Sequence, residues 1–177
     1  EDGTIEGVEY IGAYAFQDCE NLKTVQMANS VKEIGSLAFY HCTSLQNINI
    51  SIGIKEVPDY CFSGCKSLTK IEFSEDFKED VVIGDNAFVD CSNLETVKLS
   101  SKVVSIHGNA FGRCAKLKNI EVAKGNKNFK FENGMLLGNE EKEIIILLET
   151  AIKNNTIEIP STVTKLNMNQ ILGYSNI

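Results

Sequence analysis

One motif with a phenylalanine, a cysteine and a leucine in fixed order occurs five times in this chain. In the first copy these residues are Phe16, Cys19 and Leu22, and successive phenylalanines lie 23, 23, 26 and 23 residues apart. The cysteines and leucines keep the same intervals. A period of about 20 to 29 residues is typical of solenoids, in which each unit buries its apolar side only against its neighbours. The sequence therefore predicts a stack of coils rather than one closed globule.

Each copy continues from its leucine into a string of alternating apolar and polar residues, such as Leu22-Lys23-Thr24-Val25-Gln26-Met27. Alternation of this kind predicts a short strand with one side buried and the other facing outward. One strand per coil, stacked in parallel, would bring the outward side chains together in a polar stripe. The stripe and candidate binding surface comprises Thr24, Gln26, Asn47, Asn49, Lys70, Glu72, Thr96, Lys98, Asn119 and Glu121. It has no aromatic side chain to act as an obvious anchor for a partner, and a merely solvated sheet face is the alternative interpretation.

The segment before each cysteine, such as Gly12 to Phe16, is expected to reverse the chain through a helical or 3-10 turn. Its phenylalanine would fill the space between coils. The predicted core ladder comprises Phe16, Phe39, Phe62, Phe88, Phe111, Cys19, Cys42, Cys65, Cys91 and Cys114. The one interval of 26 residues places extra residues at 74–80, an acidic segment that predicts a solvated loop; a calcium site is the alternative, but no EF-hand spacing or turn glycine is present.

The cysteines are expected to be buried, reduced side chains. Equivalent positions in neighbouring coils lie roughly 5 Å apart, and free cysteine packs as a compact apolar residue. Disulfides between adjacent rungs are an alternative that this separation permits, although side chains that point in parallel disfavour them. Zinc binding is disfavoured because the chain has no pair of cysteines separated by two residues.

The repeat pattern is interrupted at Asn126. Residues 129–137 predict two extended segments joined by the turn Asn133-Gly134, and a β-rich run follows at 143–149. We expect a single domain in which five repeats at about 5–123 are followed by a β-hairpin interruption at about 126–155. A degenerate sixth repeat is expected at about 156–177. Both ends fall within a repeat and lack a polar capping unit, so a fragment of a longer array is expected.

The repeat, written φ-x-x-I-G-x-x-A-F-x-x-C-x-x-L-x-x-I-x-I with φ apolar, resembles the BspA-like, or Treponema-type, leucine-rich repeat. Departures are Pro58 and His107 at the glycine position, Cys61 at the alanine position, and Ile171 and Tyr174 in the last unit. The resemblance implies an α/β-type leucine-rich repeat solenoid, mostly β, that is curved and right-handed. It places parallel strands on the concave face, short helical or 3-10 turns opposite, and a β-hairpin interruption near residues 129–149.

Composition excludes several functions. A net charge of −7 disfavours nucleic acid as a partner, and no apolar run is long enough to insert into a membrane. The two histidines, His41 and His107, occupy different positions of different repeats, and no catalytic or phosphate-binding motif is present. Neither a cofactor nor a metal site nor an enzymatic activity is therefore expected.

Members of the resembled family are typically surface or secreted proteins of host-associated bacteria and some parasitic protists, linked to adhesion. The resemblance thus implies a non-enzymatic binding module at the cell surface or outside the cell. The implied partner is a protein, such as a host matrix or cell-surface protein, held on the concave strands. The alternative function is a structural spacer that displays other domains.

Overall fold

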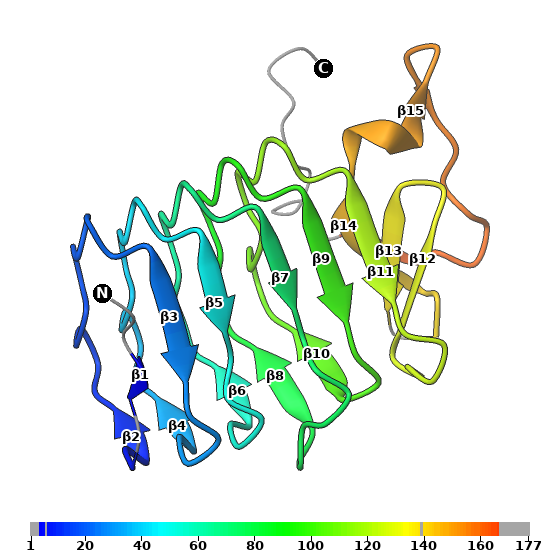
Figure 1. Cartoon of the computed structure of the whole chain (residues 1–177). Coiled ribbons are helices and arrows are strands. Elements are labelled where there is room, and N and C mark those ends of the chain that lie inside the picture. The colour runs from blue at the N-terminus through cyan, green and yellow to red at the C-terminus, as the bar shows by residue number, and fades with distance from the viewer. Residues whose placement is uncertain (1–3, 6, 139, 167–177) are drawn as a thin grey trace.

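The computed structural model describes residues 4–5, 7–138 and 140–166 and shows two rows of parallel strands along a stack of coils (Figure 1). One row, in two three-stranded sheets, contains the five strands that the sequence predicts and one further strand, at residues 4–5, that the prediction did not include. The first contains β1 (Thr4–Ile5), β3 (Thr24–Met27) and β5 (Asn47–Asn49), and the second contains β7 (Lys70–Glu72), β9 (Thr96–Leu99) and β11 (Asn119–Val122). The predicted leucine-rich repeat solenoid, mostly β with parallel strands, is therefore confirmed.

A second row of shorter strands was missed by the prediction of one strand per coil. It comprises β2 (Tyr10–Ile11) and β4 (Glu33–Ile34), followed by β6 (Glu56–Val57), β8 (Val81–Ile83) and β10 (Val103–Ile106). Ile11 pairs with Ile34, and Val57 with Ile83, so the apolar residue before the glycine position forms its own ladder. Each coil thus contributes one strand to each of the two rows.

The phenylalanines stack face to face through the middle of the coils. Centroids of successive rings are 5.1 Å apart between Phe16 and Phe39, 5.2 Å between Phe39 and Phe62, 5.4 Å between Phe62 and Phe88, and 5.3 Å between Phe88 and Phe111. Phe39, Phe62 and Phe88 have no exposed surface, whereas Phe16 is half-buried. Because Phe39, Phe62 and Phe88 each lie between two other rings, stability depends on neighbouring coils.

The turns that carry these rings are not the expected helical turns. The only helix among the described residues is the 3-10 helix η1 (Glu149–Ala151), beyond the repeats. Phe16 N donates to Ala38 O of the next coil at 2.8 Å, whereas Cys19 N donates to Phe16 O within its own coil at 3.2 Å. A helix would use every N–H internally, whereas here alternate N–H groups join the coils.

This alternation is accompanied by left-handed backbone at two places in each of the first four turns and at one of these places in the fifth. Most of these places carry residues other than glycine. The first place is occupied by Tyr14, Leu37, Tyr60 and Asn86, and the second by Asp18, His41, Gly64, Asp90 and Arg113, all with φ between 55° and 74°.

Four of the five cysteines predicted to form the buried ladder are buried. Cys42, Cys65, Cys91 and Cys114 are buried, but Cys19 is exposed. Each buried thiol donates to the carbonyl of a phenylalanine in the preceding coil, as Cys42 Sγ does to Phe16 O at 3.1 Å. Cys19 lies in the first described turn, so a neighbouring turn packs on one side of it only. All six cysteines are free, and none forms the alternative disulfide.

The acidic insertion is anchored to the core at one point. Phe77 is 3% exposed and packs near Phe73, with ring centroids 6.3 Å apart. The Glu75 carboxylate accepts hydrogen bonds from the backbone N and the hydroxyl of Ser101 in the next coil. The predicted solvated loop is correct for most of its side chains but not for Phe77.

The interruption begins with the predicted hairpin. β12 (Phe129–Glu132) pairs antiparallel with β13 (Met135–Gly138) around Asn133-Gly134, which confirms the hairpin, and β13 pairs with β14 (Glu143–Leu147). β14 then pairs in parallel with β17 (Lys165–Leu166), with Glu143 opposite Lys165, so the spacing of successive coils returns at β14. A small hairpin of β15 (Ile152–Lys153) and β16 (Thr156–Ile157) lies between them. Residues 167–177 of the predicted sixth repeat lie outside the described residues.

Candidate binding surface

The ten predicted surface residues form two rows on the outward side of β3, β5, β7, β9 and β11, here called the strand face. In the first row Thr24 lies opposite Asn47, and Thr96 lies between Lys70 and Asn119. In the second row Gln26 lies opposite Asn49, and Lys98 lies between Glu72 and Glu121. The parallel register thus produces the predicted stripe, with an interruption between β5 and β7, which belong to different sheets.

The charged half of the strand face is a connected ion-pair network. Glu72 Oε1 lies 2.6 Å from Lys70 Nζ and 3.0 Å from Lys98 Nζ, and Lys98 Nζ lies 3.3 Å from Glu121 Oε2. Hydrogen bonds from Lys70 and Lys98 lower the pKa of the Glu72 carboxyl, and the bond to Glu72 raises the pKa of Lys98. Asn119 Nδ2 also donates to Glu121 Oε1 at 3.1 Å. These charges largely satisfy one another.

The amide-rich half differs because its side chains lack such partners. Within the described residues, no hydrogen bond involves the side chains of Thr24, Gln26, Asn47 or Asn49. These side chains can donate and accept hydrogen bonds without first breaking an internal one. The half formed by β3 and β5 is therefore better prepared to contact a polar partner than the charged half.

A shallow polar groove of about 430 Å³ runs beside the strand face where the strands begin. Its lining contains one predicted residue, Asn47, and six that sequence reasoning missed: Gln46, Ser67, Thr69, Asn93, Glu95 and Lys116. The repeat positions just before the outward strand residues could have identified them. The groove widens the polar surface that a partner would meet.

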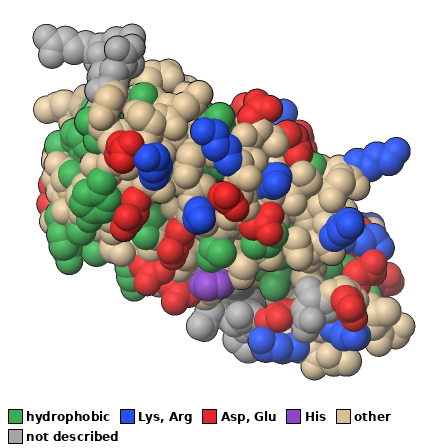
Figure 2. Space-filling view, turned by 90° about the horizontal axis from the view of Figure 1, so that it is seen from below, with side chains coloured by type: hydrophobic (Ala, Val, Ile, Leu, Met, Phe, Trp, Pro, Cys, Tyr) green, Lys and Arg blue, Asp and Glu red, His purple; other side chains and the backbone are tan. Residues whose placement is uncertain are grey.

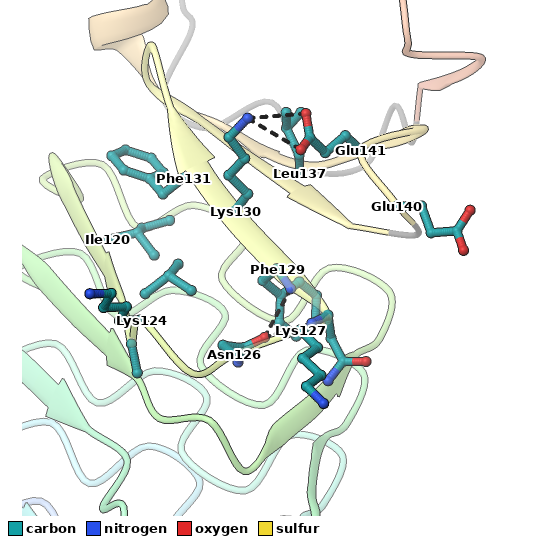
Figure 3. A pocket seen from close by; sticks show the side chains of 13 residues that line it. Ile120, Lys124, Asn126, Lys127, Phe129, Lys130, Phe131, Leu137, Glu140 and Glu141 are labelled. Atoms are coloured by element: carbon teal, nitrogen blue, oxygen red, sulfur yellow. Dashed lines mark hydrogen bonds and ion pairs between the residues drawn. The ribbon is translucent and has the colours of Figure 1, made fainter.

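A larger hollow of about 600 Å³ lies between β11 and the hairpin, and we call it the terminal cleft (Figure 3). Ile120 and Val122 line it from β11, and Phe129, Lys130 and Phe131 line it from β12. Lys124, Lys127 and the pair Glu140 and Glu141 complete its rim. The prediction did not include this cleft; the available signal was three lysines spaced three residues apart, at 124, 127 and 130, where the repeat pattern stops.

Other features of the described residues provide little chemistry. His41 stacks on Tyr40, with ring centroids 4.3 Å apart, and its Nδ1 lies 3.6 Å from Asp18 Oδ1; His107 is exposed. No group of three or more histidine, cysteine or acidic residues in the described part of the chain is arranged to hold a metal ion. Burial raises the pKa of the Cys42 and Cys114 thiols to about 12, which removes the thiolate needed for a nucleophile.

The face seen from below in Figure 2 carries acidic and basic side chains in an interleaved pattern, with hydrophobic side chains between them. A broad region of one sign, which would attract a polyanion, is not visible on this face. In the described ranges, no helix is both long and apolar enough to cross a membrane.

Comparison with known protein families identifies the family of the repeat. The model of the BspA type leucine rich repeat region matches residues 4–118 and 77–177, with six copies. The chain belongs to this family. The BspA-type assignment agrees with the stacked phenylalanines, the parallel strand rows and the near absence of helix. No curated protein matches the chain.

Several solved bacterial protein structures share the fold. A leucine rich cell surface protein from Faecalibacterium prausnitzii is 39% identical with a TM-score of 0.63, over 69% of this chain and 32% of its own. A leucine-rich repeat protein from Eubacterium ventriosum is 26% identical with a TM-score of 0.72, over 92% of this chain and 42% of its own. The pneumococcal vaccine antigen PcpA, 19% identical with a TM-score of 0.66 over 94% of this chain and 51% of its own, shows the same fold. This chain therefore spans less than half the length of the first two proteins.

Proposed function

We propose that this BspA-type chain is a non-enzymatic protein-binding module of a cell-surface or secreted protein and that it binds through the strand face. The proposal rests on the outward polar side chains of β3 and β5, which form no hydrogen bond within the described residues. Thr24 and Asn47 lie side by side there, as do Gln26 and Asn49, and their polar groups are directed outward without an internal bond. Regularly spaced donors and acceptors on a rigid sheet are suited to an extended protein contact.

Similarity to a solved structure supports the proposed cellular location. The Faecalibacterium prausnitzii structure, 39% identical over 69% of this chain, is of a cell surface protein. Adhesion to a host matrix or cell-surface protein is the form of binding that we propose for such a location. The structural spacer remains the second candidate, supported by the internally neutralised network of Glu72 and Lys98, which offers a partner little unpaired charge.

The test is a surface plasmon resonance screen of immobilised matrix and cell-surface proteins against this chain. Bound proteins are then tested against two variants. The first, Gln26→Ala with Asn49→Ala, removes two outward amides. The second exchanges the network charges through Lys70→Glu, Glu72→Lys, Lys98→Glu and Glu121→Lys, which keeps every ion pair of the network but inverts the pattern that a partner meets.

The matched control exchanges an ion pair away from the strand face, Glu9→Lys with Lys32→Glu, whose charged atoms are 2.6 Å apart. Binding through the strand face predicts about thirtyfold weaker affinity for the amide variant, because two hydrogen bonds of about 1 kcal/mol each are removed, and unchanged affinity for the control. Unaltered binding by both strand-face variants would exclude this surface. A screen without any bound protein would favour the spacer.

A further inference from the structure

The terminal cleft separates two strand edges, and within the described residues no backbone hydrogen bond joins them. β11 is the last strand of the sheet β7-β9-β11, and β12 is the first of the sheet β12-β13-β14-β17. On β11, Asn119 and Glu121 pair with β9, and Ala123 N donates to Leu99 O at 2.9 Å. Backbone groups of successive strand residues point to opposite edges. The N–H and C=O groups of Ile120 and Val122 are therefore directed away from β9, toward the cleft.

The hairpin presents an edge of its own. Its two-residue turn makes Glu132 and Met135 the closing pair, so Glu132 and Lys130 exchange bonds with β13. The backbone groups of Phe129 and Phe131 then point outward, and Phe129 N is already bound to Asn126 Oδ1 at 2.9 Å. Phe131 is half-buried and, with Leu137, gives the cleft an apolar wall (Figure 3).

The unpaired charge at this cleft is positive in a chain whose net charge is −7. Lys130 Nζ lies 3.1 Å from a carboxylate oxygen of both Glu132 and Glu141, and Glu140 pairs with Lys142 at 2.8 Å, so each acidic rim residue already has a lysine partner. Lys124 and Lys127 are exposed, and within the described residues neither forms an ion pair. Two free ammonium groups beside an apolar wall and a free strand edge favour an acidic ligand of extended shape.

We propose that the terminal cleft binds an extended peptide segment of a partner protein that alternates apolar and acidic side chains, and that this segment pairs with the free edge of β11 as a further strand. Its backbone bonds to Ile120 and Val122, its apolar side chains contact Phe131 and Leu137, and its carboxylates meet Lys124 and Lys127. Edge addition of this kind derives affinity from main-chain hydrogen bonds and specificity from alternate side chains. The site is separate from the strand face and does not rest on the function proposed for that face.

The test uses a short acetylated and amidated peptide of alternating valine and glutamate, titrated into the full chain by calorimetry. Saturable binding is expected, and the same peptide with lysine in place of glutamate should bind at least about tenfold more weakly, because attraction to two lysines becomes repulsion. Absence of binding at millimolar peptide, or equal binding of both peptides, would overturn the proposal. The assay needs no partner from the surface screen, so either proposal can fail alone.

Variants then locate the site. Lys124→Glu with Lys127→Glu should weaken binding of the glutamate peptide by about tenfold. The matched control is Lys23→Glu with Lys55→Glu, which changes the charge equally at two exposed lysines outside the cleft and should leave affinity within about twofold, since distant surface charges are screened. Equal losses in both variants would indicate general attraction to the peptide rather than this cleft.

N-methylated peptides and hydrogen exchange test the strand pairing. Methylation of one alternate set of peptide nitrogens should abolish binding, whereas methylation of the other set should be tolerated, because only one set faces β11. Amide exchange at Val122 should slow when the peptide binds. Equal tolerance of both methylation patterns, or slowed exchange at Phe131 without any change at Val122, would contradict pairing with β11.

Discussion

A Cβ atom on Gly35 would lie only 2.2 Å from the backbone N of Ala13 in the preceding coil. The two coils lie close together at this point, where Gly35 N also donates to Ile11 O at 2.8 Å. The repeat therefore uses glycine here for space between coils rather than for a left-handed turn, and its φ is not in the positive range.

Gly35→Ala should destabilise the fold by about 1–3 kcal/mol, because the added methyl group has to push two hydrogen-bonded coils apart. Urea denaturation followed by circular dichroism measures the free energy of unfolding. The control is Gly125→Ala, where the new Cβ would meet only Ser101 Cβ at an ordinary 3.5 Å. Equal losses at both positions would show that close approach of the coils is not the reason for Gly35.

Phe62→Ala should cost about 3–5 kcal/mol of unfolding free energy, because it opens a cavity between two stacked rings in a site without exposed surface. Phe16→Ala should cost less, because Phe16 is half-buried and has a single stacking partner within the described residues. Thermal and urea denaturation of both variants provide the comparison. A larger loss for Phe16 than for Phe62 would contradict the dependence on two-sided stacking.

Iodoacetamide should modify Cys19 first in the native protein, since it is the one exposed cysteine. The other thiols should react only in denaturant, because the reactive form is the thiolate. Burial raises the pKa of Cys42 and Cys114 to about 12 and raises those of Cys61, Cys65 and Cys91 as well. Peptide mass spectrometry after timed labelling identifies the modified sites. Modification of native Cys42 as fast as that of Cys19 would show that the ladder opens readily.

Glu72→Gln should reduce the acid sensitivity of the fold. The folded-state pKa of Glu72 lies below its ordinary value of 4.5, so its ion pairs stabilise the protein above that value, and this contribution is lost as the pH falls through the folded-state pKa. The effect should be small because Lys70, Glu72 and Lys98 are each more than a third exposed to solvent. Urea unfolding of both proteins at a series of pH values is the measurement. An unchanged difference in stability between pH 7 and pH 3 would argue against the network.

Local pattern was sufficient to predict the strands after each repeated leucine and the stacked rings. Val25 and Met27 are buried and Gln26 is exposed because side chains alternate along a strand. Phe39 and Phe62 stack because a fixed period brings equivalent residues to the same place in successive coils. The turn Asn133-Gly134 was predictable because both residues accept the positive φ that a tight hairpin needs.

The turn conformation and the exposure of Cys19 could not be predicted in the same way. A motif with good helical residues, such as Ala38-Phe39, instead uses alternate N–H groups to join coils, and only the neighbouring coil provides those acceptors. Cys19 has the same sequence surroundings as Cys42, yet it is exposed because burial depends on coils on both sides.

The sequence by itself determined the repeat, the buried strand positions and the outward polar residues, because these depend on periods of two residues along a strand and about 23 between coils. Only the tertiary structure decided that Glu72 joins Lys70 and Lys98, and that Ile120 borders a cleft rather than a further paired strand. Both outcomes depend on the register of chain segments far apart in sequence and on where the hairpin packs. Short-range alternation does not specify either of them.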